Sequence, residues 1–354
     1  MSTAKLKFTK SWRGSLADYI TALQWSPDGA WLGMASASGE VALYDQTSAD
    51  FAILRQADGQ SINALGFSAD SQFLAAGGQS GTITVWDTKA SGSSPLWSQS
   101  YDGEWIDRLA WHPSQNYLAY GVGSKVYIWD ISGNQKLAEL DFADSSVLHL
   151  AWHPDGICLA VSGHGGIKIW SAEDWQTPPK LIEVPGASLH CAWSDDGRYL
   201  GSGNLDRTLT VAEVESPPPW LMQGFPGKVR QVAWSNLPTQ SGSPLIAAAC
   251  LEAITVWERQ APSGGGWKSR VLQHHRERVN AIAFQPDSLL LAAAGQDGVV
   301  SLWEQGKTLA TSLKFPQGGC SALAWHPTQP LLAVAGTTGE VMVWKQEQRS
   351  KGFG

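Results

Sequence analysis

The sequence predicts an all-β fold, a β-propeller of eight four-stranded blades. Three observations lead to this prediction. A phrase of similar sequence recurs eight times, its copies follow one another at nearly constant spacing, and every copy contains short β-type runs separated by turn residues. Four strands in a period of about 40 residues are typical of a propeller blade rather than of a solenoid.

Each repeat is marked by the aromatic residue that ends its first run. Neighbouring marks are 41 to 44 residues apart, except for one step of 50 residues that contains the segment PSGGGW at 262–267. We expect this glycine-rich insert to be a surface loop. We number the repeats one to eight by their marks, which are Trp25, Phe67, Trp111, Trp152, Trp193, Trp234, Phe284 and Trp325.

The elements follow the same order in each repeat. A first run such as VNAIAF ends at the mark, and S-P-D-G or H-P-D-G then predicts a tight turn. An apolar run rich in small residues follows, and a glycine-rich turn leads into an alternating run such as TITVW. One more short apolar run, such as LAEL or SLKF, lies between repeats and supplies the fourth strand.

These repeats resemble WD40 repeats. The Trp-Asp pair that gives the family its name is kept at Trp86-Asp87 and at Trp129-Asp130, and the resemblance covers almost the whole chain. Repeat five departs from the pattern with Ala212-Glu213 at this position, and repeat six has a longer first turn, NLPTQSGSP. The resemblance implies a WD40-type propeller that acts as a non-catalytic scaffold for a protein partner.

The ends of the chain predict how the ring closes. We expect residues 1–354 to form a single propeller domain, with a strand at about 5–12 completing the last blade and a polar tail at about 346–354. Seven blades would result if repeat six were too irregular to form one. Its VRQVAW and ITVW runs are intact, so eight blades are expected.

Composition and charge exclude several classes of protein. The net charge is −7 without a basic run, so we expect no nucleic acid partner. No apolar stretch reaches the length of about 18 residues that a membrane span needs, and the N-terminus lacks a secretory pattern, so a cytoplasmic monomer is expected. We expect reduced, buried thiols at the four isolated cysteines, Cys158, Cys191, Cys250 and Cys320.

Several histidines are expected to have structural roles. The resemblance implies that His275, Asp297 and Trp303 occupy positions that form a hydrogen-bonded network in WD40 repeats. In that network a serine links the histidine to the tryptophan. Ala293 stands at the expected serine position, so this network should be only partial. The histidines of the three WHP turns, His112, His153 and His326, are expected to be structural or solvent-facing.

The inner strands contain a polar sector. The residue three before each mark is alanine in four repeats, whereas repeats three to six carry Arg108, His149, His190 and Gln231 there. Polar groups that the fold does not require are candidates for binding. We therefore predict that a protein partner binds the upper face of blades three to six, through Asp107, Arg108, Arg230 and Gln231.

The same sector suggests an alternative function. His164 replaces the turn aspartate of repeat four, and Asp206 is the turn residue of repeat five. Convergence of His149, His164 and His190, with Asp206 or water as the fourth ligand, would form a zinc site. The alternative is thus a zinc-binding protein or a metalloenzyme. No cofactor is expected otherwise, and no nucleotide-binding or hydrolase motif indicates an enzyme.

Overall fold

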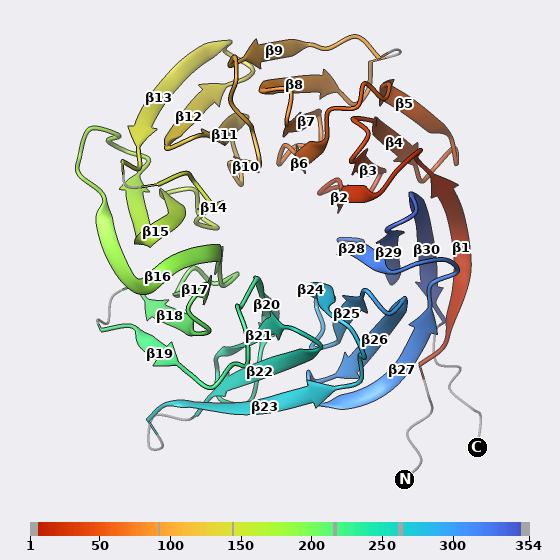
Figure 1. Cartoon of the computed structure of the whole chain (residues 1–354), viewed down its shortest axis with the longest axis vertical. Coiled ribbons are helices and arrows are strands. Elements are labelled where there is room, and N and C mark those ends of the chain that lie inside the picture. Colours follow the sequence, from red (N-terminus) through yellow and green to blue (C-terminus); the bar gives the residue numbers. More distant parts are fainter. Residues whose placement is uncertain (1–5, 91–92, 144, 215–217, 261–264, 348–354) are drawn as a thin grey trace.

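The computed structural model describes residues 6–90, 93–143, 145–214, 218–260 and 265–347. Within these ranges the regular elements are β-strands, and they form seven antiparallel sheets. Figure 1 shows the sheets arranged in a ring, so the architecture is a β-propeller. None of the residues described here belongs to a helix that is long and apolar enough to cross a membrane.

Six sheets have four strands each, and five of these correspond to single repeats. Repeats one to three form the sheets β2 (Ile20–Trp25), β3 (Trp31–Ser36), β4 (Val41–Asp45) and β5 (Phe51–Arg55); β6 (Ile62–Phe67), β7 (Phe73–Gly78), β8 (Thr82–Asp87) and β9 (Trp97–Ser100); and β10 (Arg108–Trp111), β11 (Tyr117–Val122), β12 (Lys125–Asp130) and β13 (Gln135–Asp141). Repeats six and seven form the sheets β20 (Gln231–Pro238), β21 (Pro244–Cys250), β22 (Ala253–Arg259) and β23 (Trp267–Gln273); and β24 (Val279–Phe284), β25 (Leu291–Gly295), β26 (Val299–Glu304) and β27 (Thr308–Lys314).

The prediction of eight four-stranded blades is wrong, because the ring contains seven sheets and one of them has six strands. Repeat six, which the sequence marked as the irregular one, forms an ordinary sheet. Repeats four and five instead share the six-stranded sheet. Its strands are β14 (His149–Trp152), β15 (Cys158–Ser171), β16 (Lys180–Trp193), β17 (Tyr199–Asn204), β18 (Leu209–Glu213) and β19 (Trp220–Met222).

The merger has a local cause in two strands of 14 residues each, β15 and β16. The first half of β16 pairs with β15 and its second half pairs with β17, and the two halves meet at Gly186, which has a left-handed φ of 74°. β15 itself turns back at Gly165 and Gly166, and the Ala172 N–H donates to the Ile157 carbonyl at 2.9 Å. The link between the two repeats is therefore strand rather than loop.

The N-terminal strand completes the last sheet of the ring. In the order β28 (Cys320–Trp325), β29 (Leu331–Gly336), β30 (Glu340–Gln346) and β1 (Phe8–Ser15), the first strand of the chain is the outer edge. Its pairing with β30 runs from Phe8 opposite Gln346 to Ser15 opposite Glu340. Figure 1 shows β1 at the perimeter beside β30. Of the predicted polar tail at 346–354, residues 348–354 lie outside the described residues.

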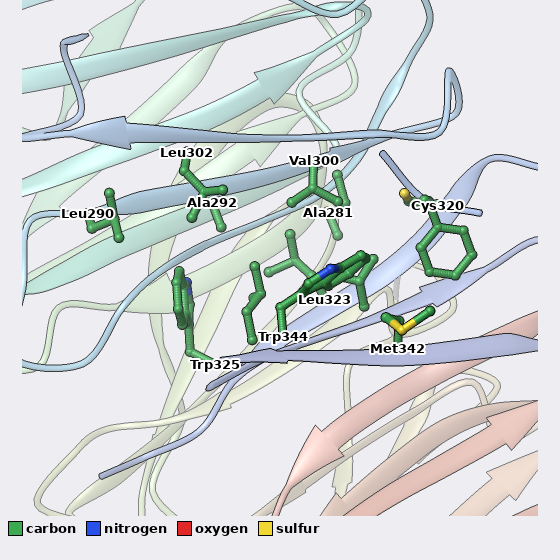
Figure 2. Close-up of a cluster of buried hydrophobic side chains, with 14 of the residues drawn as sticks. Ala281, Leu290, Ala292, Val300, Leu302, Cys320, Leu323, Trp325, Met342 and Trp344 are labelled. Carbon is green, nitrogen blue, oxygen red and sulfur yellow. The ribbon is translucent and has the colours of Figure 1, made fainter. Parts of the chain in front are cut away.

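The hydrophobic core lies between neighbouring sheets. Every residue of β29 is buried, since both faces of this strand are covered, and its small side chains let the flanking sheets approach. Figure 2 shows one such layer, in which Trp325 and Trp344 of the last sheet lie near Leu290 and Leu302 of repeat seven. Most tryptophans therefore fill space between sheets, as the repeat pattern indicates.

Hydrogen bonds between repeats hold these layers in register. In five repeats the indole N–H at the end of the inner strand donates to a backbone carbonyl of the preceding repeat. The pairs are Trp111–Gly66 (2.9 Å), Trp152–Ala110 (3.1 Å), Trp193–Ala151 (3.1 Å), Trp234–Ala192 (2.9 Å) and Trp325–Ala283 (3.2 Å).

The histidines of the three WHP turns each connect their own repeat to the next one. Nε2 of His112 lies 3.2 Å from the carbonyl oxygen of Gly156, and Nε2 of His153 lies 3.1 Å from that of Gly197. Nε2 of His326 makes the equivalent contact with Gly29 at 3.1 Å, where the last repeat meets the first. All three histidines are buried. They have the structural role that was expected, and none of them faces solvent.

Candidate functional site

The predicted site residues gather on one face of the ring, which we call the loop face. It carries the segments that enter the inner strands and the turns between the second and third strands of each repeat. In repeat three, Gly123 of the β11–β12 turn lies against Glu104 of the segment that enters β10. In repeats five and six, Leu205 of the β17–β18 turn and Lys228 of the segment that enters β20 line one pocket.

Arg108 has partners within the protein. Its Nε donates to the Leu148 carbonyl of the next repeat at 2.6 Å, and its NH1 donates to the Asp107 carbonyl at 2.7 Å. Burial lowers the pKa of the guanidinium below its usual value, but the group remains charged at neutral pH. Asp107 accepts a hydrogen bond from Asn63 Nδ2 at 2.6 Å. Both predicted binding residues thus also connect neighbouring repeats.

His149 and His190 come together on the inner strands. Their ring centroids are 4.1 Å apart and the rings are tilted by 40°. Burial lowers the pKa of His190 to about 4, with a smaller effect from the charge of Arg108. Burial, His190 and Arg108 lower the pKa of His149 well below its usual value. Both imidazoles are therefore neutral at physiological pH.

Cys191 is the third polar group of this cluster. Its Sγ lies 3.8 Å from Nδ1 of His149. Burial raises the pKa of the thiol to about 12, so it stays protonated near neutral pH and is a poor nucleophile. Nδ1 of His190 is buried and has no hydrogen-bond partner among the described residues. The cluster therefore has one unpartnered nitrogen but no activated thiolate.

The structure does not bring His164 to this cluster. The His164 side chain is exposed in β15, and its backbone N–H donates to Ser145 Oγ at 2.9 Å. Asp206 is also exposed, lies beside Gly186, and accepts a hydrogen bond from Thr208 Oγ1 at 2.7 Å. Over the part of the chain that the structure describes, no three histidine, cysteine or acidic side chains are grouped as metal ligands.

Gln231 and Arg230 are adjacent in sequence and have different surroundings. Gln231 Oε1 accepts a hydrogen bond from the Ile282 N–H of repeat seven at 2.9 Å, which gives this side chain a structural role. The Arg230 side chain is exposed and lines a pocket of about 590 Å³. Of the four predicted partner-binding residues, Arg230 is thus the most accessible to a partner.

Sequence reasoning missed several residues of the loop face. Arg207, Lys228 and Arg278 share the pocket of Arg230. Trp105 is 55% exposed and lines a second pocket, of about 290 Å³, together with Asp107 and Arg108. Arg207 could have been found, because it stands five residues before the WD position, where other repeats carry glycine. Trp105 stands six residues before its mark, a position whose residue type varies from repeat to repeat, so it gave no signal.

The expectation of a partial network around His275 is wrong. Ser301 of β26, and not a residue at position 293, provides the missing hydroxyl. Nδ1 of His275 lies 3.1 Å from Asp297 Oδ1, and its Nε2 lies 2.8 Å from Ser301 Oγ. The Trp303 indole N–H donates to the same hydroxyl at 2.9 Å. The network is complete, and it joins the segment that enters β24 to β26.

Comparisons with known proteins agree with the repeat pattern. A family model described as WD domain, G-beta repeat, matches residues 6–45, 52–87, 134–171, 266–304 and 306–345, which together make up more than half of the chain. The chain is also similar to Polyadenylation factor subunit 2 of Candida albicans (strain SC5314 / ATCC MYA-2876), with 25% identity over 118 residues. The matched segment covers 33% of this chain, and the chain spans about a fifth (21%) of that relative.

Proposed function

The chain belongs to the WD40 repeat family, and on that premise we propose that it is a non-catalytic scaffold that binds a protein partner on the loop face of repeats three to six. Propellers of this family typically act as protein-interaction scaffolds. The similar protein from Candida albicans is named as a subunit of a factor, which agrees with a role in an assembly. Because a fold alone does not define a function, the proposal depends on the side chains of the loop face.

The exposure of Trp105 is the observation that supports the proposal most strongly. A tryptophan that is 55% exposed beside a pocket lined by Asp107 and Arg108 has large apolar area to bury against a partner. Tryptophan and arginine are enriched among the residues that dominate binding energy at protein interfaces. Arg230 lines the second pocket of the same face.

Affinity purification with matched variants tests this proposal. The wild-type protein, the Trp105→Ala/Arg230→Ala variant and a Leu96→Ala/Lys10→Ala control are used to recover proteins from a lysate of the source organism. Leu96 is as exposed as Trp105, at 55%, and Lys10 is an exposed cation of β1, away from the loop face. We expect at least one protein to be recovered with wild type and control but about tenfold less with the loop-face variant. Equal recovery with all three proteins, or no recovery, would contradict the proposal.

Zinc binding is a second candidate function, supported by the contact between His149 and His190. Neutral imidazoles are the form of histidine that binds zinc, and the thiol of Cys191 is adjacent. Elemental analysis of protein purified without a histidine tag tests this candidate. One equivalent of zinc that is lost in the His149→Ala/His190→Ala variant would support it. No metal after incubation with zinc would rule it out.

A further inference from the structure

The loop face contains a pocket whose charged lining is entirely cationic. Its volume is about 590 Å³, and it lies where repeats five, six and seven meet. Arg207 comes from the β17–β18 turn, Lys228 and Arg230 from the segment that enters β20, and Arg278 from the segment that enters β24. Segments far apart in the sequence thus bring four positive charges to one place, on a chain whose net charge is −7.

These four cations have no partners among the described residues. All four side chains are exposed, and within the described ranges none of them makes an ion pair or a side-chain hydrogen bond. The neighbouring carboxylates Asp206, Glu252 and Glu277 do not line the pocket. Like charges held close together repel one another, and an anionic ligand would relieve that repulsion.

The backbone at Arg207 points to a function for its side chain. Arg207 has a φ of 69°, in the left-handed region that side chains other than glycine rarely adopt. The equivalent position, five residues before the position of the WD tryptophan, is glycine at Gly39 (φ 99°), Gly81 (69°), Gly298 (70°) and Gly339 (88°). Glycine would fit the turn without steric penalty, so the fold itself does not require an arginine there.

Leu251, a second residue that lines the pocket, also has a left-handed backbone conformation. It has a φ of 51° in the β21–β22 turn, where the corresponding turn of repeat three has Gly123 at 58°. Leu251 is 41% exposed and Leu205 is 39% exposed, and both line the pocket. The two strained turns therefore give the pocket a guanidinium group and an apolar side chain, which are the features of a site for an amphipathic ligand.

We propose that this pocket binds an acidic peptide segment of a protein partner, with carboxylates on the four cations and an apolar side chain against Leu205 and Leu251. The inference rests on the proposed scaffold function and names the chemistry of its partner. Guanidinium groups bind carboxylates through paired, charge-assisted hydrogen bonds. A nucleic acid is a poorer match, since the cationic area is confined to one pocket of an acidic protein.

A displayed library of random 12-residue peptides, selected on the purified full chain, tests this proposal. Binding of the selected peptides is then measured by fluorescence anisotropy with wild type and with the Arg207→Gly, Arg278→Gln and Lys10→Gln variants. Arg207→Gly is the decisive variant, because it removes the guanidinium group and relieves the backbone. Its melting temperature should therefore not fall, and a loss of binding cannot be attributed to misfolding. Lys10→Gln removes an exposed cation of β1 at the perimeter.

We expect the selected peptides to be enriched in Asp and Glu together with an apolar residue. Their Kd should rise about tenfold or more in Arg207→Gly and Arg278→Gln, stay unchanged in Lys10→Gln, and rise with added salt. Selected peptides without acidic enrichment, equal Kd values for Arg207→Gly and wild type, or binding only by phosphorylated peptides or RNA would each overturn the proposal.

The outcome is distinguishable from a failure of the proposed function. If a protein partner is lost in the Trp105→Ala/Arg230→Ala variant but no acidic peptides are selected, only the pocket inference fails. If acidic peptides are selected but no protein partner is recovered, the scaffold function fails and the pocket chemistry stands.

Discussion

Replacement of His190 by glutamine should change how the stability of the propeller depends on pH. The pKa of His190 is lowered by burial from its usual value of 6.5 to about 4. Between these pH values the unfolded chain binds a proton that the folded chain does not, so falling pH favours unfolding. At pH 5 this proton binding lowers the unfolding free energy by about 2 kcal/mol, and at pH 8 its effect is close to zero. Because glutamine does not titrate, the variant should lack this loss.

Urea unfolding at pH 8 and at pH 5, followed by tryptophan fluorescence, measures the effect. Other groups also destabilise the protein in acid, so the relevant quantity is the difference in unfolding free energy between wild type and variant. We expect this difference to shift by about 2 kcal/mol in favour of the variant between pH 8 and pH 5. His164→Gln is the matched control, since its exposed side chain changes its surroundings little on unfolding. Parallel pH dependence of wild type and His190→Gln would show that the imidazole is not desolvated on folding.

Three further predictions concern the contacts that hold the ring together and the buried thiols. His326→Ala should lower the unfolding free energy, measured in urea, by about 1–3 kcal/mol. The imidazole of His326 is hydrogen-bonded to the Gly29 carbonyl through Nε2 and accepts hydrogen bonds from the Thr328 and Gln329 N–H groups through Nδ1, and the variant loses these bonds. Wild-type stability of that variant would refute a role in closing the ring. Ser301→Ala should also lower it by about 1–3 kcal/mol, since it leaves His275 and Trp303 without their shared partner. An unchanged melting temperature would argue against the network. In the native protein, iodoacetamide should leave Cys191 and Cys320 unmodified in a mass spectrum, because burial raises the pKa of each thiol to about 12. Rapid labelling would contradict their burial.

The repeat pattern predicted the type of fold but not the number of sheets. Apolar runs, turn residues and their spacing indicate a propeller, since these features depend on local sequence. The sharing of one sheet by repeats four and five depends on whether the segment at Pro185 and Gly186 stays within one strand, and the sequence pattern there would also fit a loop. Tertiary packing determines whether this segment forms strand or loop, so the number of sheets does not follow from the repeat pattern.

The candidate site was predictable only in part, for a related reason. The polar sector of the inner strands is visible in the sequence. The sequence does not show that Arg108 and Gln231 reach backbone groups of the next repeat, because such contacts depend on how sheets are placed side by side. The contact between His149 and His190 and the exposure of His164 also depend on how the sheets are placed side by side, so the sequence does not show them. Arg207 was readable in principle, as a non-glycine residue in a glycine position.

Site-specific photo-crosslinking tests the docking of a protein on the loop face most directly. A p-benzoylphenylalanine residue is placed at position 105 in one protein and at position 96 in another, and both are irradiated in cells of the source organism. Trp105 and Leu96 are equally exposed, at 55%, but only Trp105 lies on the loop face. We expect a defined crosslinked protein from position 105 and none from position 96. Crosslinks from position 96 alone, or from neither position, would contradict it.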